Sequence, residues 1–457
     1  MSSLRSLVAA ARHLSRDEAE ALAKRVLSYA TAESTRVVVN GGSESNTRFA
    51  VNQISTAGDG YNASVSIVSM FGKRRGSVNT NRLDDQGLRE AVAASERLAR
   101  LSPEDPEAMP ELEPQQYQTP PAWSEATAAL EPDSRARAVR AISEPARAAG
   151  LISTGFLEAN GGATAIANSK GLFAYGRRTE LALTTTVRTE DGTGSGWAGT
   201  AHHDWSKVDP AALARRAIDK ARRSANPSAI EPGRYTVILE PTAVGNLLLR
   251  LQNAFSARSA DEGRSFFSKP GGGVKIGMKV VDERVTLWSD PFDTEAPSSG
   301  FSGEGLPLRR ITWMENGVVR NLAYDRYWAQ RQGVEPSPFP GTLRMSGGTQ
   351  TLDEMIASTE RGILVTRFWY IRSVDPRTIL HTGLTRDGTF LIEQGKVTRA
   401  VKNLRFNESP IFMLNNVEAL GRPERVNASE SLGPGTPIIV PSLKVRDFNF
   451  TSLSDAI

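Results

Sequence analysis

The sequence predicts an α+β protein of two domains, one mixing helices with strands and one rich in antiparallel strands. At 457 residues the chain is too long for one compact core, which favours two domains. Its 39% hydrophobic and 23% charged residues are ordinary for a globular protein and argue against extensive disorder. Helix and strand patterns alternate before about residue 226, whereas strand patterns and glycine-rich connections dominate after it.

The N-terminal part begins with a capping box at Ser15–Glu18, which predicts a helix that ends near Ala30. Further patterns predict a buried strand over 35–40, a hairpin over 61–81 around Gly72 and a helix over 83–101. Six prolines between Ser102 and Trp123 prevent helix and strand from continuing. This segment is therefore expected to be an exposed linker or an extended crossing segment.

A helix over 134–149 is followed by repeated strand signals over 151–200. The expected turns between these strands are at Asn160-Gly161-Gly162, Ser169-Lys170-Gly171 and Asp191-Gly192. Asp209-Pro210 then starts a helix that ends near Ala225, because proline is tolerated in the first helical turn. Proline and glycine residues in Asn226-Pro227 and Glu231-Pro-Gly233 interrupt helix and strand patterns. They mark the predicted boundary between a domain of residues 1–232 and a domain of residues 233–457.

The C-terminal part begins with a predicted strand, Tyr235–Glu240, which leads through Pro241 into a predicted helix over Ala243–Arg258. Hairpins are predicted at Asn316-Gly317 and over 393–396, because these turn residues tolerate positive φ. A second capping box, over 351–354, predicts a helix that ends before residue 362.

The charge and cysteine content exclude several classes of function. The 55 Lys and Arg residues against 51 Asp and Glu leave a net charge of +4, too small to indicate a nucleic-acid surface. The absence of cysteine excludes disulfides, thiolate zinc sites and cysteine nucleophiles. No apolar run is long enough for a membrane span or a secretory signal, so a cytoplasmic protein is expected.

Candidate catalytic residues are few. His202-His203-Asp204 is a histidine cluster that either contributes to a metal site or forms a solvated strand end, and a third ligand is not evident. His381 is expected in a β-turn region, as an ordinary surface or packed residue. Serine-nucleophile and phosphate-loop motifs fail on their spacing, so these residues alone support no enzyme mechanism.

A dispersed pattern of motifs covers most of the chain and is densest over about 233–448. Its main pieces are Gly263-Arg-Ser-Phe-Phe267, Trp313–Asn321, Ser346-Gly-Gly348, Gly362–Val365, Val374-Asp-Pro376, Phe390–Val397 and Pro441–Val445. In order and spacing this pattern resembles the TldD/PmbA family of cytosolic peptidases. The resemblance implies a two-domain α+β fold.

The resemblance also implies one of two roles. Metal-bearing members of the family hold zinc with two histidines of a His-Glu-x-x-x-His helix motif and a cysteine near the C-terminus. In such a site zinc acidifies a water molecule and the glutamate relays its proton to the leaving amine. The other type lacks these residues and pairs with the first, so that peptides are cut inside a shared enclosed space.

This sequence departs from the metal-bearing pattern at every ligand. Counting back from Gly263 places the motif on Leu248, Leu249 and Asn253, and counting back from Pro441 places the cysteine near Asn427. No zinc is therefore expected in this chain. The helix has two interpretations. It is an ordinary core helix, or it lines a peptide channel with Arg250, Gln252 and Asn253.

The resulting hypothesis is a PmbA/TldE-like subunit without zinc that binds peptides and pairs with a zinc-bearing TldD-like subunit. The alternative is a non-enzymatic binding or modulator protein that acts as a homodimer. A hydrolase that uses His202 or His203 is a third interpretation. No nucleic-acid or membrane partner is expected, and the glycine-containing segment 291–305 is interpreted either as a gate or as a surface loop.

Overall fold

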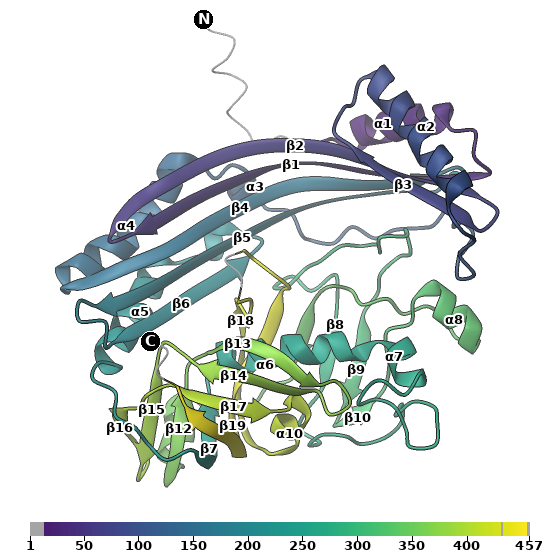
Figure 1. The fold of residues 1–457 in the computed structure, drawn as a ribbon. Helices are drawn as coiled ribbons and strands as arrows, with labels where there is room; N and C mark the ends of the chain where they lie inside the picture. The colour runs from purple at the N-terminus through teal and green to yellow at the C-terminus, as the bar shows by residue number, and fades with distance from the viewer. Residues whose placement is uncertain (1–12, 431–432, 455–457) are drawn as a thin grey trace, which may run out of the picture.

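The computed structural model describes residues 13–430 and 433–454. They form an α+β fold of two domains, in which a long curved sheet arches over a β-rich C-terminal domain (Figure 1). The α+β class predicted from the sequence is confirmed.

The N-terminal sheet has six strands in the order β3-β2-β1-β4-β5-β6, and all neighbours are antiparallel. Its strands are β1 (Ser34–Ala50), β2 (Gln53–Phe71), β3 (Arg74–Thr80), β4 (Leu151–Asn168), β5 (Phe173–Thr189) and β6 (Ser195–His202). The strands predicted over 35–40 and 61–70 are parts of much longer strands that reach the β1–β2 turn at Val51 and Asn52.

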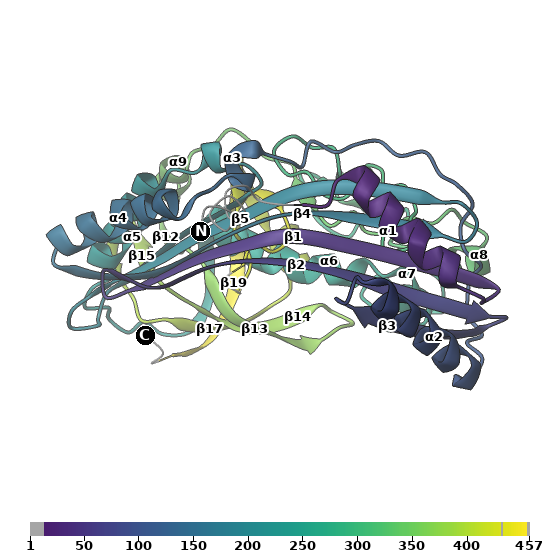
Figure 2. The same ribbon diagram turned by 90° about the horizontal axis from the view of Figure 1, so that it is seen from above.

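Two pairs of helices cover the outer face of this sheet at its two ends (Figures 1 and 2). Residues of α1 and α2 form one apolar cluster with β1, β2 and β4, and residues of α4 and α5 form another with β4, β5 and β6. The helix bounds are α1 (Arg16–Tyr29), α2 (Asp85–Leu101), α3 (Glu125–Ala128), α4 (Pro132–Ala148) and α5 (Pro210–Arg223). The predicted capping box of α1 is present, with the Ser15 hydroxyl accepting from the amide of Glu18.

Residues 102–123, all of them described, contain neither helix nor strand, as the prolines predict. They form a crossing segment that contacts both domains, and Asn168 of β4 donates to the carbonyl of Leu112 at 2.8 Å. Arg258 donates two hydrogen bonds of 2.7 Å to Glu107, and the Tyr117 hydroxyl donates to the carbonyl of Gly305 at 2.6 Å. The segment therefore ties the N-terminal sheet to the C-terminal domain rather than serving as a free linker.

The C-terminal sheet is mixed rather than purely antiparallel. The predicted antiparallel order fails for two pairs, because β12 runs parallel to β7 and β11 runs parallel to β19. Its strands are β7 (Gly233–Leu239), β8 (Leu287–Ser289), β9 (Ile311–Glu315), β10 (Val318–Val319), β11 (Leu343–Met345), β12 (Arg361–Val365), β13 (Phe368–Asp375), β14 (Leu380–Thr385), β15 (Thr389–Glu393), β16 (Lys396–Ala400), β17 (Leu404–Glu408), β18 (Val417–Val426) and β19 (Ile438–Leu453).

The helices of this domain are α6 (Pro241–Gln252), α7 (Ala257–Asp261), α8 (Arg326–Gln332), α9 (Leu352–Ala357) and α10 (Pro410–Asn415). The single helix predicted over Ala243–Arg258 is wrong, because it is divided by a 3-10 turn over Asn253–Phe255. Ser256 then caps a new helix, its hydroxyl accepting from the amide of Ser259. The buried helix α6 therefore ends at Gln252, and α7 begins as a separate helix at Ala257.

β1 and β4 approach each other closely around Gly41-Gly42 of β1 and Gly161-Gly162 of β4. The turn predicted at Asn160-Gly161-Gly162 is wrong, because these residues continue β4. Gly42 of β1 pairs directly with Gly162 of β4, and a Cβ atom on Gly42 would lie 2.7 Å from the Cα of Gly162. Glycine within a strand often marks such an approach or a bend, and Figure 1 shows the sheet strongly curved.

Candidate functional site

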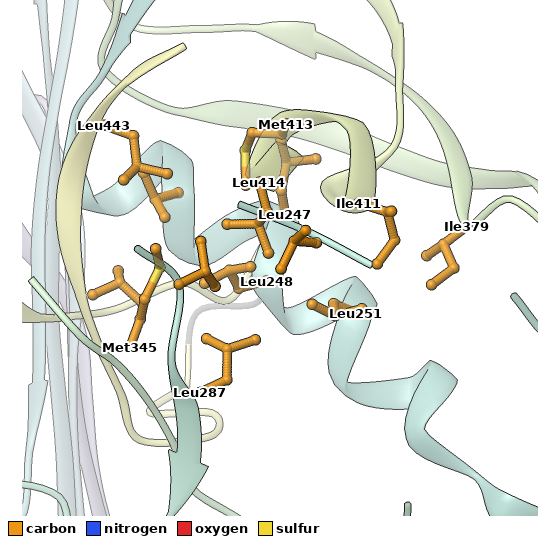
Figure 3. Packing of buried hydrophobic residues seen from close by; sticks show 14 of the residues in the cluster. Leu247, Leu248, Leu251, Leu287, Met345, Ile379, Ile411, Met413, Leu414 and Leu443 are labelled. Carbon is orange, nitrogen blue, oxygen red and sulfur yellow. The ribbon is translucent and has the colours of Figure 1, made fainter. Parts of the chain in front are cut away.

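The positions that match the family zinc motif lie on α6 and in the 3-10 turn after it. Leu248 is fully buried in the C-terminal core, where Figure 3 shows it beside Leu247 and Leu251 of the same helix. Leu249 is half-buried and Asn253 is exposed. Two of these three side chains are therefore hydrocarbon and carry no donor atom for a metal.

The position that matches the family cysteine lies against the same helix. Asn427 is buried, and its neighbour Ala428 accepts a hydrogen bond of 2.8 Å from the Asn246 amide of α6. A Cβ atom on Gly245 would lie 2.9 Å from the Cβ of Ala428. Gly245 and Asn246 precede Leu248 by less than one helical turn. The fold thus brings the helix positions of the family zinc motif and the position of the family cysteine close together, although they are far apart in the sequence.

The residues at this place do not suit zinc. Zinc takes thiolate, imidazole or carboxylate ligands, whereas this chain offers leucine side chains and the amides of Asn253 and Asn427. Asn427 accepts from the amide of Ser429 at 3.2 Å, while its own buried Nδ2 has no hydrogen-bond partner. Within residues 13–430 and 433–454, no group of three or more His, Cys, Asp or Glu could hold a metal ion.

The three residues proposed to line a peptide channel have different surroundings. Arg250 donates from Nη2 to Glu430 at 2.6 Å, so its charge is already paired. Its Nε and the Oε1 of Gln252 are buried without a hydrogen-bond partner, and Asn253 is exposed beyond the end of α6. The channel assignment for these residues stays a prediction.

A cavity with several polar side chains in its walls lies under the concave face of the N-terminal sheet. This central cavity has a volume of about 530 Å³ and lies between β1, β4 and β5 on one side and residues 298–303 of the C-terminal domain on the other. Asn40, Thr164, Arg178 and Glu180 give it polar walls. Small-ligand pockets span roughly 300–1,000 Å³, so the central cavity is large enough for part of a peptide.

The segment interpreted as a gate or a surface loop forms a packed wall of the central cavity. Phe301 is 6% exposed and packs in an apolar cluster with β4 and β5 residues. Ser298 donates to the carbonyl of Pro340 at 2.6 Å, and a Cβ atom on Gly300 would lie 2.8 Å from the carbonyl oxygen of Gln118. These contacts fix the segment between the crossing segment and the C-terminal domain.

The histidine pair lines a separate small pocket of about 20 Å³, together with the half-buried Arg425 and with Glu180, which also lines the central cavity. The rings of His202 and His203 stack with their centroids 4.7 Å apart, and His202 Nδ1 accepts from the amide of Asp204 at 2.9 Å. Burial, with the nearby positive charges of Arg425 and His203, lowers the pKa of His202 to about 4. The strand end expected here is present, because β6 ends at His202, but both rings are half-buried rather than fully solvated.

Arg425 and Glu180 were not recognised in the sequence as partners of the histidines. Arg425 is on β18 and donates to the backbone carbonyls of Ala201 and Glu295, whereas Glu180 is on β5. Burial raises the pKa of Glu180 and lowers that of Arg425 to about 10. No local motif joins segments so far apart in the chain. His381, expected in a β-turn, is instead buried in β14.

The fold and the central cavity define a two-domain α+β protein in which a cavity lies between a curved sheet and a β-rich domain. Two family models match it. The PmbA/TldA metallopeptidase central domain matches residues 113–225, and the PmbA/TldA metallopeptidase C-terminal domain matches residues 232–452. The chain belongs to the TldD/PmbA family, as its motifs predict.

Several proteins resemble the chain over much of its length. A metalloprotease of Methanothermobacter thermautotrophicus is 25% identical over 287 residues, which are 58% of this chain and 61% of that protein. The crystal structure of TldE from Thermococcus kodakarensis matches with a TM-score of 0.81 and 20% identity, over 95% of this chain and 99% of that one. A Thermotoga maritima protein described as a candidate modulator of a DNA gyrase matches with a TM-score of 0.83 and 17% identity, over 94% and 100%.

The chain thus aligns with less than two thirds of that curated metalloprotease, whereas the two solved structures match over nearly their whole length. At these identities the structural likeness establishes the shared fold. The predicted domain boundary at 232/233 stays a prediction. The central-domain model ends at residue 225 and the C-terminal-domain model begins at residue 232.

Proposed function

We propose that this chain is a PmbA/TldE-like subunit without zinc that binds peptides and pairs with a zinc-bearing TldD-like subunit. In that pair, zinc would be held by residues of the partner and would supply the activation of water for hydrolysis. This chain forms one wall of the space in which the peptide is held.

The chemistry of the motif positions carries this proposal. Leu248 is buried in the core, Asn253 is exposed after α6 has ended, and Asn427 replaces the cysteine. A chain that keeps the family fold but has no histidine, cysteine or carboxylate at any of these positions cannot assemble the family's metal site. The buried packing of Leu248 also favours the interpretation of α6 as a core helix.

The central cavity supports peptide binding. It lies between the two domains and combines a sheet floor with side-chain donors and acceptors from Asn40, Thr164, Arg178 and Glu180. A site of this kind can hold an extended backbone without demanding one sequence.

The relatives support the pairing. One structure of the same fold is a TldE, and a curated relative in Buchnera aphidicola is a TldD-homologous metalloprotease. None of the described helices is long and apolar enough to cross a membrane. We place the proposed pair in the cytoplasm.

The test is peptide cleavage by this chain alone, by a His-Glu-x-x-x-His paralogue from the same genome alone, and by the two together. We expect the mixture to cleave an unstructured peptide, and a zinc chelator to abolish that activity. Chelator-resistant cleavage by this chain alone would contradict the proposal and would favour a hydrolase built on His202 or His203.

A second candidate is a non-enzymatic modulator that acts as a homodimer. It is favoured by the description of the Thermotoga maritima structure as a candidate gyrase modulator. The same mixing experiment separates the two functions. A homodimer that does not associate with the paralogue and leaves its activity unchanged supports the second candidate.

A further inference from the structure

A second cavity, separate from the central one, lies between the two domains near the end of the sheet that carries α4 and α5. This arginine cavity has a volume of about 240 Å³. Its N-terminal wall comes from β1, β4, β5 and β6, and its C-terminal wall comes from residues near β13, from the turn after β14 and from residues 429–430. A water molecule takes about 30 Å³ in the liquid, so the volume suits a small group with a few waters.

Arg367 is the most buried arginine of this cavity, at 5% exposed. Its guanidinium lies over two indole rings, with the centroid of Trp197 4.3 Å away and that of Trp369 5.0 Å away. Such cation–π contacts are made by the face of a guanidinium, whereas its hydrogen bonds are made by the N–H groups at its edge. Nη1 lies 3.4 Å from Asp387, while the buried Nε has no hydrogen-bond partner. The protein thus keeps a charged donor out of water and leaves it incompletely satisfied.

The charges that line the arginine cavity are unbalanced. They are Arg48, Arg188, Arg367 and Arg386 against Asp387 and Glu430. Glu430 accepts from Arg250 at 2.6 Å and from the amide of Ile371 at 3.0 Å. The Glu430 carboxylate is therefore hydrogen-bonded to residues that do not line the cavity.

Asp387 is the remaining carboxylate of the lining, and it also accepts from the Ser195 hydroxyl at 2.5 Å. Within the described residues no salt bridge joins Arg48 or Arg188 to an acid, and the Arg48 guanidinium lies over the Phe156 ring, 5.6 Å from its centroid. The lining therefore carries more positive than negative side chains. Arg48 is exposed and Arg188 is half-buried, so the cost of burying an incompletely paired charge falls on Arg367.

We propose that the arginine cavity is an oxyanion-binding site whose ligand is the C-terminal carboxylate of a bound peptide. Arginine binds the two oxygens of a carboxylate or phosphate through its planar fork, which makes it the side chain suited to such a group. The peptide source rests on the proposed function, whereas the oxyanion chemistry does not. Free phosphate shares this chemistry and is the second source that the experiment distinguishes.

The experiment is calorimetric titration of the full-length chain at constant ionic strength. The probes are acetyl-tetraalanine with a free carboxylate, the same peptide with a C-terminal amide, and sodium phosphate. The variant is R48Q/R188Q, which removes two rim arginines without touching the buried Arg367. The matched control is R137Q/R140Q, which removes the same charge from two exposed arginines of α4.

We expect the acid peptide to bind at least about ten-fold more tightly than the amide, because a charge-assisted hydrogen bond is lost with the carboxylate. R48Q/R188Q should weaken that binding by about ten-fold or more, while R137Q/R140Q should leave it unchanged. A second result also supports the oxyanion site. If phosphate binds and R48Q/R188Q weakens its binding, while the acid and amide peptides bind equally, the ligand of the site is phosphate.

Two results would overturn the inference. One is wild-type protein that binds neither the acid peptide nor phosphate, a result that needs no variant to fold. The other is equal binding by R48Q/R188Q and R137Q/R140Q. Either result leaves the proposed pairing untouched, because association with a zinc-bearing subunit and peptide cleavage are measured separately.

Discussion

Leu248 and Asn253 show how single residues separate a scaffold helix from a zinc helix. Both match ligand positions of the family motif, yet one side chain is completely buried and the other is exposed. The sequence predicted which ligands are missing, because residue identity is read directly. It left the role of the helix open, because burial depends on the strands and on α10 packed around it.

The substitution Leu248→Ala should therefore act on stability. Removing a buried leucine leaves a cavity that costs about 2–5 kcal/mol of the free energy of unfolding. The matched control Asn253→Ala should change it by less than about 0.5 kcal/mol, because the side chain is exposed. Urea denaturation followed by tryptophan fluorescence measures both variants. Equal, small effects would contradict the interpretation of α6 as a core helix.

His202 should make the protein less stable in mild acid. Its pKa is lowered to about 4 in the folded chain, mainly by burial, from an ordinary value of 6.5. Between these two pH values the unfolded chain binds the proton more readily than the folded chain does. The free energy of unfolding is therefore unaffected by His202 above about pH 6.5 and decreases as the pH falls toward 4. Thermal melting at pH 7.5 and pH 5 should show a smaller loss for His202→Gln than for the wild type. An identical loss in the two proteins would refute this role for His202.

Elements were predicted well where the local signal matched the tertiary structure. The hairpin at Asn316-Gly317 is present because both residues adopt positive φ, at 49° and 75°. The β1–β2 turn was missed, because Val51 adopts a φ of 50° that β-branched residues rarely take. Tertiary contacts hold that turn instead, since Asn52 accepts from Ser153 and Arg147 donates to the Asn52 carbonyl.

The crossing segment 102–123 is the element whose role changes most. Its prolines correctly predict the absence of helix and strand, yet its side chains tie the two domains together. Hydrogen bonds to distant carbonyls leave no trace in a local pattern, so the sequence could not distinguish this segment from a flexible linker.

Tyr117→Phe should measure how much this connection contributes. The hydroxyl donates to the Gly305 carbonyl, and burial raises its pKa to about 12. Its removal should lower the free energy of unfolding by about 1 kcal/mol. The control Tyr61→Phe changes a tyrosine that is 45% exposed and should have no comparable effect. If both variants unfold at the same urea concentration as the wild type, the segment does not restrain the domains through this contact.

At the scale of the whole molecule, the cavities depend on how the two domains meet. The central cavity joins residues near 40, 160 and 300, and the arginine cavity joins residues near 48, 188 and 367. The sequence predicted the two domains and the family, but these walls exist only once the curved sheet covers the C-terminal domain (Figure 1). Sites of this kind cannot be derived from motif spacing along the chain.

The central claim is that the zinc chemistry belongs to a partner of this chain. Native mass spectrometry of the chain co-expressed with a His-Glu-x-x-x-His paralogue tests it most directly. The account predicts a complex that contains both chains and zinc, in which zinc stays with the paralogue when the two are separated. A zinc ion that stays with this chain, or a failure of the two chains to associate, would contradict it.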